Sequence, residues 1–287
     1  MQIIDPHLHL FNLQQGKYSW LRPENPPFWP DKQQINRDFS EQDLQLTSGL
    51  SLAGYVHIEA GFDNSASWTE ADWVSAQANI AHRSVAHLDL RLDPDAFTAG
   101  LNELRKRPAV TGIRHILDEE LEQILSHENT QENFTKLQQS ELHFELQFDA
   151  RLQKNVALVI ELLSRFPRLH FVLNHAGYVA SGDNSLAQGV TLSNLAKLAA
   201  RPNISVKSSG YEMQDRDFSL INAAAVTEKL TELFGLERVM LASNFPLITL
   251  SLGYAKYWQG LIEALAARNL AAEPLVYANA KRIYRFD

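Results

Sequence analysis

Short apolar runs alternate with amphipathic segments along this chain. Eight of the runs have the length and composition of β-strands, and they cover residues 2–4, 54–59, 85–90, 110–116, 142–148, 169–174, 204–207 and 238–242. Most segments between them have apolar residues at three- and four-residue spacing, which predicts helices. The clearest helices are predicted over 151–166, 192–200 and 226–234. Pro167 and Pro202 follow the first two, and Gly235 follows the third as a left-handed helix-ending residue.

This alternation of strands and helices predicts a parallel sheet with helical crossovers. Eight such units in 287 residues favour a single (β/α)8 TIM barrel, an α/β fold. The rival is a doubly wound open sheet, which usually has a Gly-rich phosphate-binding turn after its first strand. Here Leu10-Phe11-Asn12 follows instead. Because no linker, charge block or low-complexity segment interrupts the pattern, residues 1–287 are predicted to form one domain.

The segment after the first strand, residues 11–43, is long and has neither a helical nor an alternating period. It contains Tyr18, Trp20, Phe28 and Trp29 together with four prolines. Loops of this length are uncommon unless they have a function. In a barrel this loop would leave the carboxyl end of the first strand, on the face where active sites lie. Two interpretations stay open: a lid over a pocket, or an aromatic-anchored loop that covers the barrel rim.

Composition narrows the possible partners and environment. Apolar residues make up 45% and charged residues 21%, as in soluble globular proteins. A net charge of −8 without a Lys/Arg run gives no support for binding nucleic acid or an anionic membrane. The absence of cysteine excludes disulfides, thiolate nucleophiles and thiolate metal ligands. With no basic leader and no bilayer-spanning apolar run, we expect a cytoplasmic protein that binds a small-molecule substrate.

Candidate chemistry begins in the first strand, where Asp5, His7 and His9 occupy every second position. Side chains of a strand alternate between its two faces, so these three are expected to share a face. Buried imidazoles and carboxylates need hydrogen-bond partners, a metal or water. Polar residues also lie at the ends of six of the other seven predicted strands: His57 and Glu59, Arg114 and His115, Gln147, Asn174 and His175, Lys207, Ser208 and Ser209, and Ser243 and Asn244. Such an asymmetry is typical of a barrel with its site at the carboxyl face.

The Asp5-Pro6-His7-Leu8-His9 segment resembles the D-x-H-x-H motif of the amidohydrolase superfamily. The whole chain resembles its amidohydrolase-2 branch, which holds 2-pyrone-4,6-dicarboxylate lactonase and L-fuconolactonase-type lactonases. Further matches lie at 17–21, 37–39, 112–115, 171–177, 207–210, 238–246 and 279–284. The resemblance implies a hydrolase that opens a small sugar-acid or carboxylated lactone, and relatives of this kind are often homodimers.

Roles for individual residues follow from this resemblance. His7 and His9 would polarise the lactone carbonyl or bind a metal, and His175 would orient or activate water. Arg114 would clamp a substrate carboxylate, since its planar fork suits bidentate contact. Lys207 is expected to be a further substrate-binding residue, with a cation at the barrel rim as the alternative. Asn244 and Glu59 would complete the pocket, and Tyr18, Trp20 and Trp29 would close over it.

One position departs from the family pattern, because Asn244 stands where the family usually has an aspartate. In the family that aspartate is the general base and, where metal is present, a ligand. An amide cannot take a proton from water, and positioned proton transfer is worth roughly 10²–10⁴-fold in rate. The candidates to replace it are Glu59, His175 and His57.

The departure also bears on cofactors. His7, His9 and His175 could supply three nitrogen ligands, which together with water suit a catalytic zinc. With the carboxylate gone, we expect either no required metal or one weakly held divalent ion, with zinc as the expected metal. Two alternative functions stay open. One is a zinc-dependent decarboxylase of the same superfamily, and the other is a catalytically silent binder of sugar acids.

Overall fold

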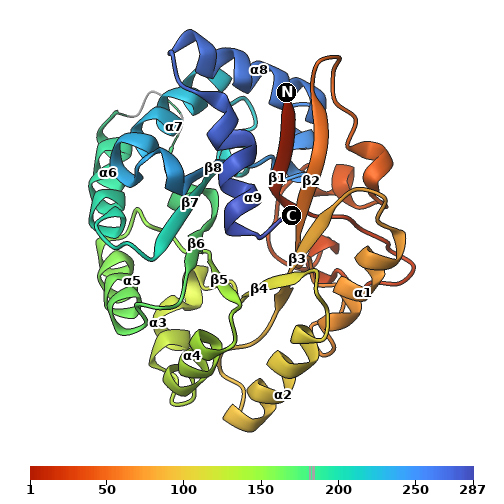
Figure 1. Cartoon of the computed structure of the whole chain (residues 1–287), viewed down its shortest axis with the longest axis vertical. Helices are drawn as coiled ribbons and strands as arrows, with labels where there is room; N and C mark the ends of the chain where they lie inside the picture. The colour runs from red at the N-terminus through yellow and green to blue at the C-terminus, as the bar shows by residue number, and fades with distance from the viewer. Residues whose placement is uncertain (181, 183–184) are drawn as a thin grey trace.

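Eight parallel strands form the centre of the molecule in the computed structural model, which describes residues 1–180, 182 and 185–287 (Figure 1). Neighbours in the sheet follow the chain order from β1 to β8. The strands are β1 (Gln2–Leu8), β2 (Ser51–Ile58), β3 (His82–His87), β4 (Val110–Arg114), β5 (His143–Leu146), β6 (Phe171–Leu173), β7 (Ile204–Ser208) and β8 (Val239–Leu241).

The sheet curls so that its first and last strands meet. Leu8 forms a parallel bridge with Phe245, just beyond β8. The amide of Asn244 donates to the carbonyl of His7 at 2.9 Å, and the amide of His9 donates to the carbonyl of Phe245 at 2.6 Å. The predicted (β/α)8 barrel is therefore confirmed, and the open doubly wound sheet is excluded.

Helices follow the strands and surround the barrel in Figure 1. They are α1 (Trp68–Gln77), α2 (Pro94–Arg105), α3 (Leu121–Ser126), α4 (Thr130–Gln139), α5 (Gln153–Arg165), α6 (Ser185–Ala199), α7 (Leu220–Phe234), α8 (Tyr254–Ala267) and α9 (Asn279–Ile283). Helix α5 buries Val156, Val159 and Leu163 against the strands, as its apolar period predicts. Gly235 ends α7 with a φ of 84°, but its ψ of 146° lies outside the left-handed helical region that we expected.

Apolar side chains fill one end of the barrel interior. Ile4, Val56, Val85 and other strand residues pack there against Tyr284 and Phe286 of the C-terminal segment. A larger apolar layer lies between the strands and the helices. In the described part of the chain, no helix has the length and apolar character that crossing a membrane requires.

The long segment after β1 is held firmly against the barrel. It contains the short 3-10 helices η1 (Ser19–Leu21), η2 (Lys32–Ile35) and η3 (Glu41–Asp43). The buried ammonium of Lys32 donates to three carbonyl oxygens of the same segment, at 2.7–2.9 Å. Tyr18 is 2% exposed and packs against Phe11, and the indole nitrogen of Trp20 donates to the carbonyl of Ala60 at 2.8 Å. These contacts support the interpretation of an aromatic-anchored loop that covers the barrel rim.

Candidate active site

Residues of β1 do not all share one face. Asp5 pairs with Tyr55 and Leu8 with His57, so three steps along β1 match two along β2, and the register shifts between them. Asp5 accepts hydrogen bonds from the Ser243 hydroxyl at 2.5 Å and from the Tyr254 hydroxyl at 3.2 Å. Asp5 therefore turns toward α8. The expectation that it shares a face with His7 and His9 is wrong, because a regular period of two does not survive this irregularity.

His7, His9 and His175 come together at the carboxyl end of the barrel. The ring centroid of His7 lies 5.2 Å from that of His9 and 4.6 Å from that of His175. His9 Nδ1 is 2.8 Å from the carbonyl of Ile58, and His175 Nδ1 is 3.1 Å from the Ser209 hydroxyl. Burial lowers the pKa of all three well below the usual histidine value, and nearby positive charges lower it further. The three imidazoles are therefore neutral near pH 7.

Lys207 lies inside the barrel, directly beside His7. Its ammonium is 2.7 Å from Glu145 Oε2 and 3.3 Å from His7 Nδ1, and both members of the ion pair are fully buried. Burial opposes ionisation of Glu145, but Lys207 and His143 together lower its pKa to about 2. Since Lys207 is enclosed and paired, its predicted place at the rim is wrong. The structure places it where it supports His7.

The ammonium of Lys207 also determines where His7 carries its proton. A cationic donor facing Nδ1 requires a lone pair there, so the neutral ring has its hydrogen on Nε2. His7 Nε2 is buried and has no hydrogen-bond partner among the described residues. His7 is thus a hydrogen-bond donor that the protein leaves unused.

Arg114 enters the site from β4, but three of the N–H groups of its guanidinium already donate to protein oxygens. Its Nε donates to Glu59 Oε1 at 2.7 Å, and its two terminal nitrogens donate to the Glu59 carbonyl and to Gln147 Oε1. Of the five N–H groups of a guanidinium, two remain for a ligand. His115 turns the other way and accepts from the amide of Leu90 at 3.2 Å.

Two of the candidate bases have other partners. Glu59 is committed to Arg114. His57 accepts from the amide of Leu10 at its Nδ1, and its Nε2 is 3.0 Å from the carboxylate of Glu70. His57 is therefore a core histidine that joins β2 to α1. Both side chains thus already bind protein groups.

Asn244 contacts Glu212, a residue that the sequence patterns did not indicate. Its side-chain amide donates to Glu212 Oε1 at 2.6 Å, and both side chains are 1% exposed. Burial raises the pKa of Glu212 to about 7. Glu212 follows β7 in the short helix η6 (Tyr211–Met213). The only sequence signal was an acidic residue just after the strand-7 motif, in a loop that the barrel fold directs to the carboxyl face.

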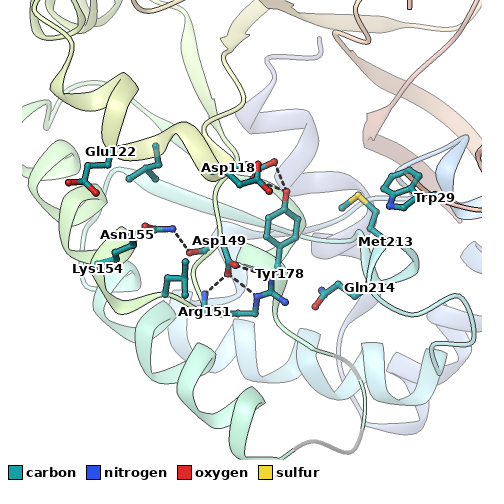
Figure 2. Close-up of a pocket in the computed structure, with 13 residues that line it drawn as sticks. Trp29, Asp118, Glu122, Asp149, Arg151, Lys154, Asn155, Tyr178, Met213 and Gln214 are labelled. Atoms are coloured by element: carbon teal, nitrogen blue, oxygen red, sulfur yellow. Dashed lines mark hydrogen bonds and ion pairs between the residues drawn. The ribbon is translucent and has the colours of Figure 1, made fainter. Parts of the chain in front are cut away.

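A cavity of about 460 Å³ lies outside the ends of β4 to β7 (Figure 2). Trp29, Asp118, Arg151, Tyr178 and Met213 are among its lining residues, but Tyr18 and Trp20 are not. Figure 2 shows Tyr178 in the middle of this group with its hydroxyl toward Asp118, 2.9 Å away. The Tyr178 ring stacks on His175 with centroids 6.3 Å apart. Tyr178 thus lies between this cavity and the three histidines, which are not part of the lining.

Comparison with known proteins identifies the family. Residues 4–286 match the family model described as amidohydrolase. This chain belongs to the amidohydrolase family. Its relative y4mH of Sinorhizobium fredii, itself uncharacterized, is 27% identical over 298 residues, covering 99% of this chain and 98% of the relative. The expected resemblance to this family is confirmed.

Solved amidohydrolase structures share the fold. An amidohydrolase from Burkholderia multivorans with bound zinc has a TM-score of 0.81 and 21% identity, with both chains fully covered. A protein from Acinetobacter baumannii, described as a probable 2-pyrone-4,6-dicarboxylic acid hydrolase with citric acid bound, has a TM-score of 0.65 and 15% identity, again with full coverage. At these identities the likeness shows the barrel rather than the substrate.

The residues of this amidohydrolase do not fit a tightly held divalent metal. In the described part of the chain, no three His, Cys, Asp or Glu side chains are arranged to hold a metal ion. Lys207 faces His7 Nδ1, which places a hydrogen on the Nε2 that would have to bind the metal. Asn244 supplies a neutral amide where a carboxylate would favour a cation. The trio His7, His9 and His175 therefore suits a hydrogen-bonding role better than a ligand role.

Proposed function

We propose that this amidohydrolase is a lactonase, which hydrolyses a small hydroxylated or carboxylated lactone at the carboxyl face of the barrel. The observation that carries the proposal is the unused Nε2 donor of His7, buried beside His9 and His175. Hydrolysis of a lactone develops negative charge on the carbonyl oxygen, and a buried N–H that needs a partner can receive that charge. The Acinetobacter protein of the same fold is described as a probable 2-pyrone-4,6-dicarboxylic acid hydrolase, and the 2-pyrone ring is a cyclic ester, which agrees with this choice.

The chemistry proposed for the histidines follows from their protonation. A neutral His7 donates from Nε2 to the carbonyl oxygen, and the two free N–H groups of Arg114 stabilise the same charge or a substrate carboxylate. His175 has its Nδ1 beside Ser209, so its Nε2 is left to hold water. Ring opening then gives a hydroxy acid, with water supplying the new oxygen of the carboxylate.

The cavity wall indicates the size and polarity of the substrate. A volume of about 460 Å³ accommodates a single small ring with its substituents. Arg151 pairs with Asp149, and Lys154 adds a second cation on the same side. Trp29 and Tyr178 offer apolar faces for the ring. Tyr178 has to shift for a substrate in this cavity to reach His175.

A panel of sugar-acid and carboxylated lactones, followed by acid release at constant pH, tests this function. We expect turnover of at least one lactone and a loss of about 10²-fold or more in His7→Ala, the size expected for one oxyanion donor. His82→Ala is the matched control, because His82 begins β3 at the opposite end of the barrel and binds Ser75. Its rate should stay at the wild-type value.

Other outcomes would point to the alternative functions. Stoichiometric zinc together with release of carbon dioxide from an aromatic or unsaturated acid would favour a decarboxylase. A rise in melting temperature with sugar acids, without turnover before or after addition of metal, would favour a silent binder.

A further inference from the structure

Glu212 is a buried carboxyl group without a cationic partner among the described residues. Its side-chain partner is the uncharged amide of Asn244, at 2.6 Å. The positive charge of Arg216, in the same loop, acts on it and lowers its pKa, but less than burial raises it. The guanidinium of Arg216 is held by Asp31, at 2.6 and 3.1 Å, and donates to the main-chain carbonyl of Glu212. Among the residues that the structure describes, no ion pair therefore holds the carboxylate of Glu212 in its charged form.

Four other carboxyl groups are buried among the described residues, and their partners differ from those of Glu212. Glu59 is bound by Arg114, Glu145 by Lys207, and Glu70 by His57 and the amide of Ala60. Asp5 has no cation, but it turns toward α8 and is held by two hydroxyls. Glu212 thus combines a position at the carboxyl face with a partner that leaves its proton affinity high.

The loop after β7, which carries Glu212, runs from His175 to the cavity. Ser209 contacts His175, and Gly210 lies so close that an added Cβ would be 2.6 Å from the His175 ring, at a φ of 77° that also favours glycine. Glu212 then meets Asn244, and the next residues, Met213 and Gln214, line the cavity. Figure 2 shows both of them on the same side of Tyr178 as Trp29.

We propose that Glu212 is the general base of the reaction, taking the place of the aspartate that the family carries at position 244. The inference rests on the proposed lactonase function. Asn244 fixes one carboxylate oxygen of Glu212 through its side-chain N–H, and the other oxygen accepts a proton from water as the water oxygen bonds to the lactone carbonyl carbon. When the ring C–O bond breaks, the leaving oxygen takes that proton back from Glu212. One lactone and one water give one hydroxy acid, and the carboxylate is regenerated.

The environment of Glu212 agrees with this role. Burial raises its pKa to about 7, so the group can accept and return a proton near neutral pH. The ionisable groups that face it are Arg216 in its own loop, Tyr211 beside it and Tyr257 of α8. Both tyrosines stay neutral in this range because burial raises their pKa. Glu212 itself is then the group expected to give the acidic limb of the rate profile.

Glu212→Gln tests the inference, because glutamine keeps the shape and still accepts the hydrogen bond from Asn244. We expect kcat to fall by about 10²–10⁴-fold with KM little changed, and the acidic limb of kcat/KM to disappear. The swapped pair Asn244→Asp with Glu212→Gln keeps one carboxyl and one amide in contact, and it should recover part of the lost rate. Glu232→Gln, in a surface ion pair with Lys229, is the matched control and should keep the rate and the acidic limb. Asp118→Asn, at the cavity wall beside Tyr178, tests a rival base and should also keep the acidic limb.

The outcomes separate the two proposals. A wild-type chain that opens lactones while Glu212→Gln keeps its rate and pH profile would overturn the role of Glu212 alone. Loss of the acidic limb in Asp118→Asn instead of Glu212→Gln would move the base to Asp118. A wild-type chain that opens no lactone of the panel would overturn the proposed function and the base with it.

Discussion

Replacing Lys207 with methionine tests how much the enclosed ion pair contributes to the barrel. Lys207 and Glu145 have no exposed side-chain surface, and their charged atoms are 2.7 Å apart. Methionine has a similar length, so the main change is a buried carboxylate without its cation. Breaking a buried pair in this way costs about 3–5 kcal/mol. Because His143 and Tyr284 still donate to Glu145, at 3.1 and 2.5 Å, we expect the lower end, about 3 kcal/mol.

Urea unfolding followed by circular dichroism measures this loss. Lys229→Met is the matched control, since its pair with Glu232 lies at the surface and should contribute nothing measurable. Adding Glu145→Gln to Lys207→Met removes the unpaired charge and should recover at least half of the loss. A loss below about 1 kcal/mol in the single variant would refute the reasoning, because it would mean that Glu145 is not charged in the folded barrel.

Three further predictions concern the site itself. Burial raises the pKa of the Glu212 carboxyl from 4.5 to about 7, so the unfolded chain ionises first and the free energy of unfolding falls as the pH rises between these values. At pH 8, Glu212→Gln should therefore be more stable than wild type by up to about 3 kcal/mol, and equal free energies of unfolding would contradict the raised pKa. Asn244→Asp should keep hydrolysis but change its pH profile, because the new carboxyl and that of Glu212 would lie close enough to share a proton. If the rate collapses while the variant still binds ligand, the proposed activation of water is wrong. Without Lys207, His7 can carry its proton on Nδ1 and offer Nε2 to a metal. Titration calorimetry should therefore show weak zinc binding to wild type and about 10–100-fold tighter binding to Lys207→Met. Equal zinc affinities would argue against control of the His7 tautomer by Lys207.

The barrel could be predicted from the sequence because it depends on a repeated signal. Each of the eight strands is a short apolar run with its own boundaries, and an error at one boundary leaves the alternation intact. Helix α5 shows the same robustness, since its apolar positions recur over several turns. The register shift in β1 shows the limit: one irregularity turned Asp5 away from His7, and local period counting does not detect it.

The site could be predicted only in part, for a related reason. His7, His9 and His175 follow strand ends, where the barrel itself brings residues together. Glu212 lies in a loop, and its contact with Asn244 spans 32 residues and depends on the loop path that Gly210 permits. A strand-end lysine such as Lys207 looks the same in sequence whether it meets solvent at the rim or pairs with a buried carboxylate such as Glu145. Which partner a polar side chain finds is decided by packing, and the sequence pattern does not contain it.

Hydrolysis in water labelled with oxygen-18 tests the central claim most directly. The lactone that gives the highest rate is incubated with the chain, with and without a strong chelator, and the product acid is analysed by mass spectrometry. We expect each turnover to add one labelled oxygen to the new carboxylate, at a rate that the chelator does not change. Release of carbon dioxide, unlabelled product, or a rate that zinc restores after chelation would contradict it.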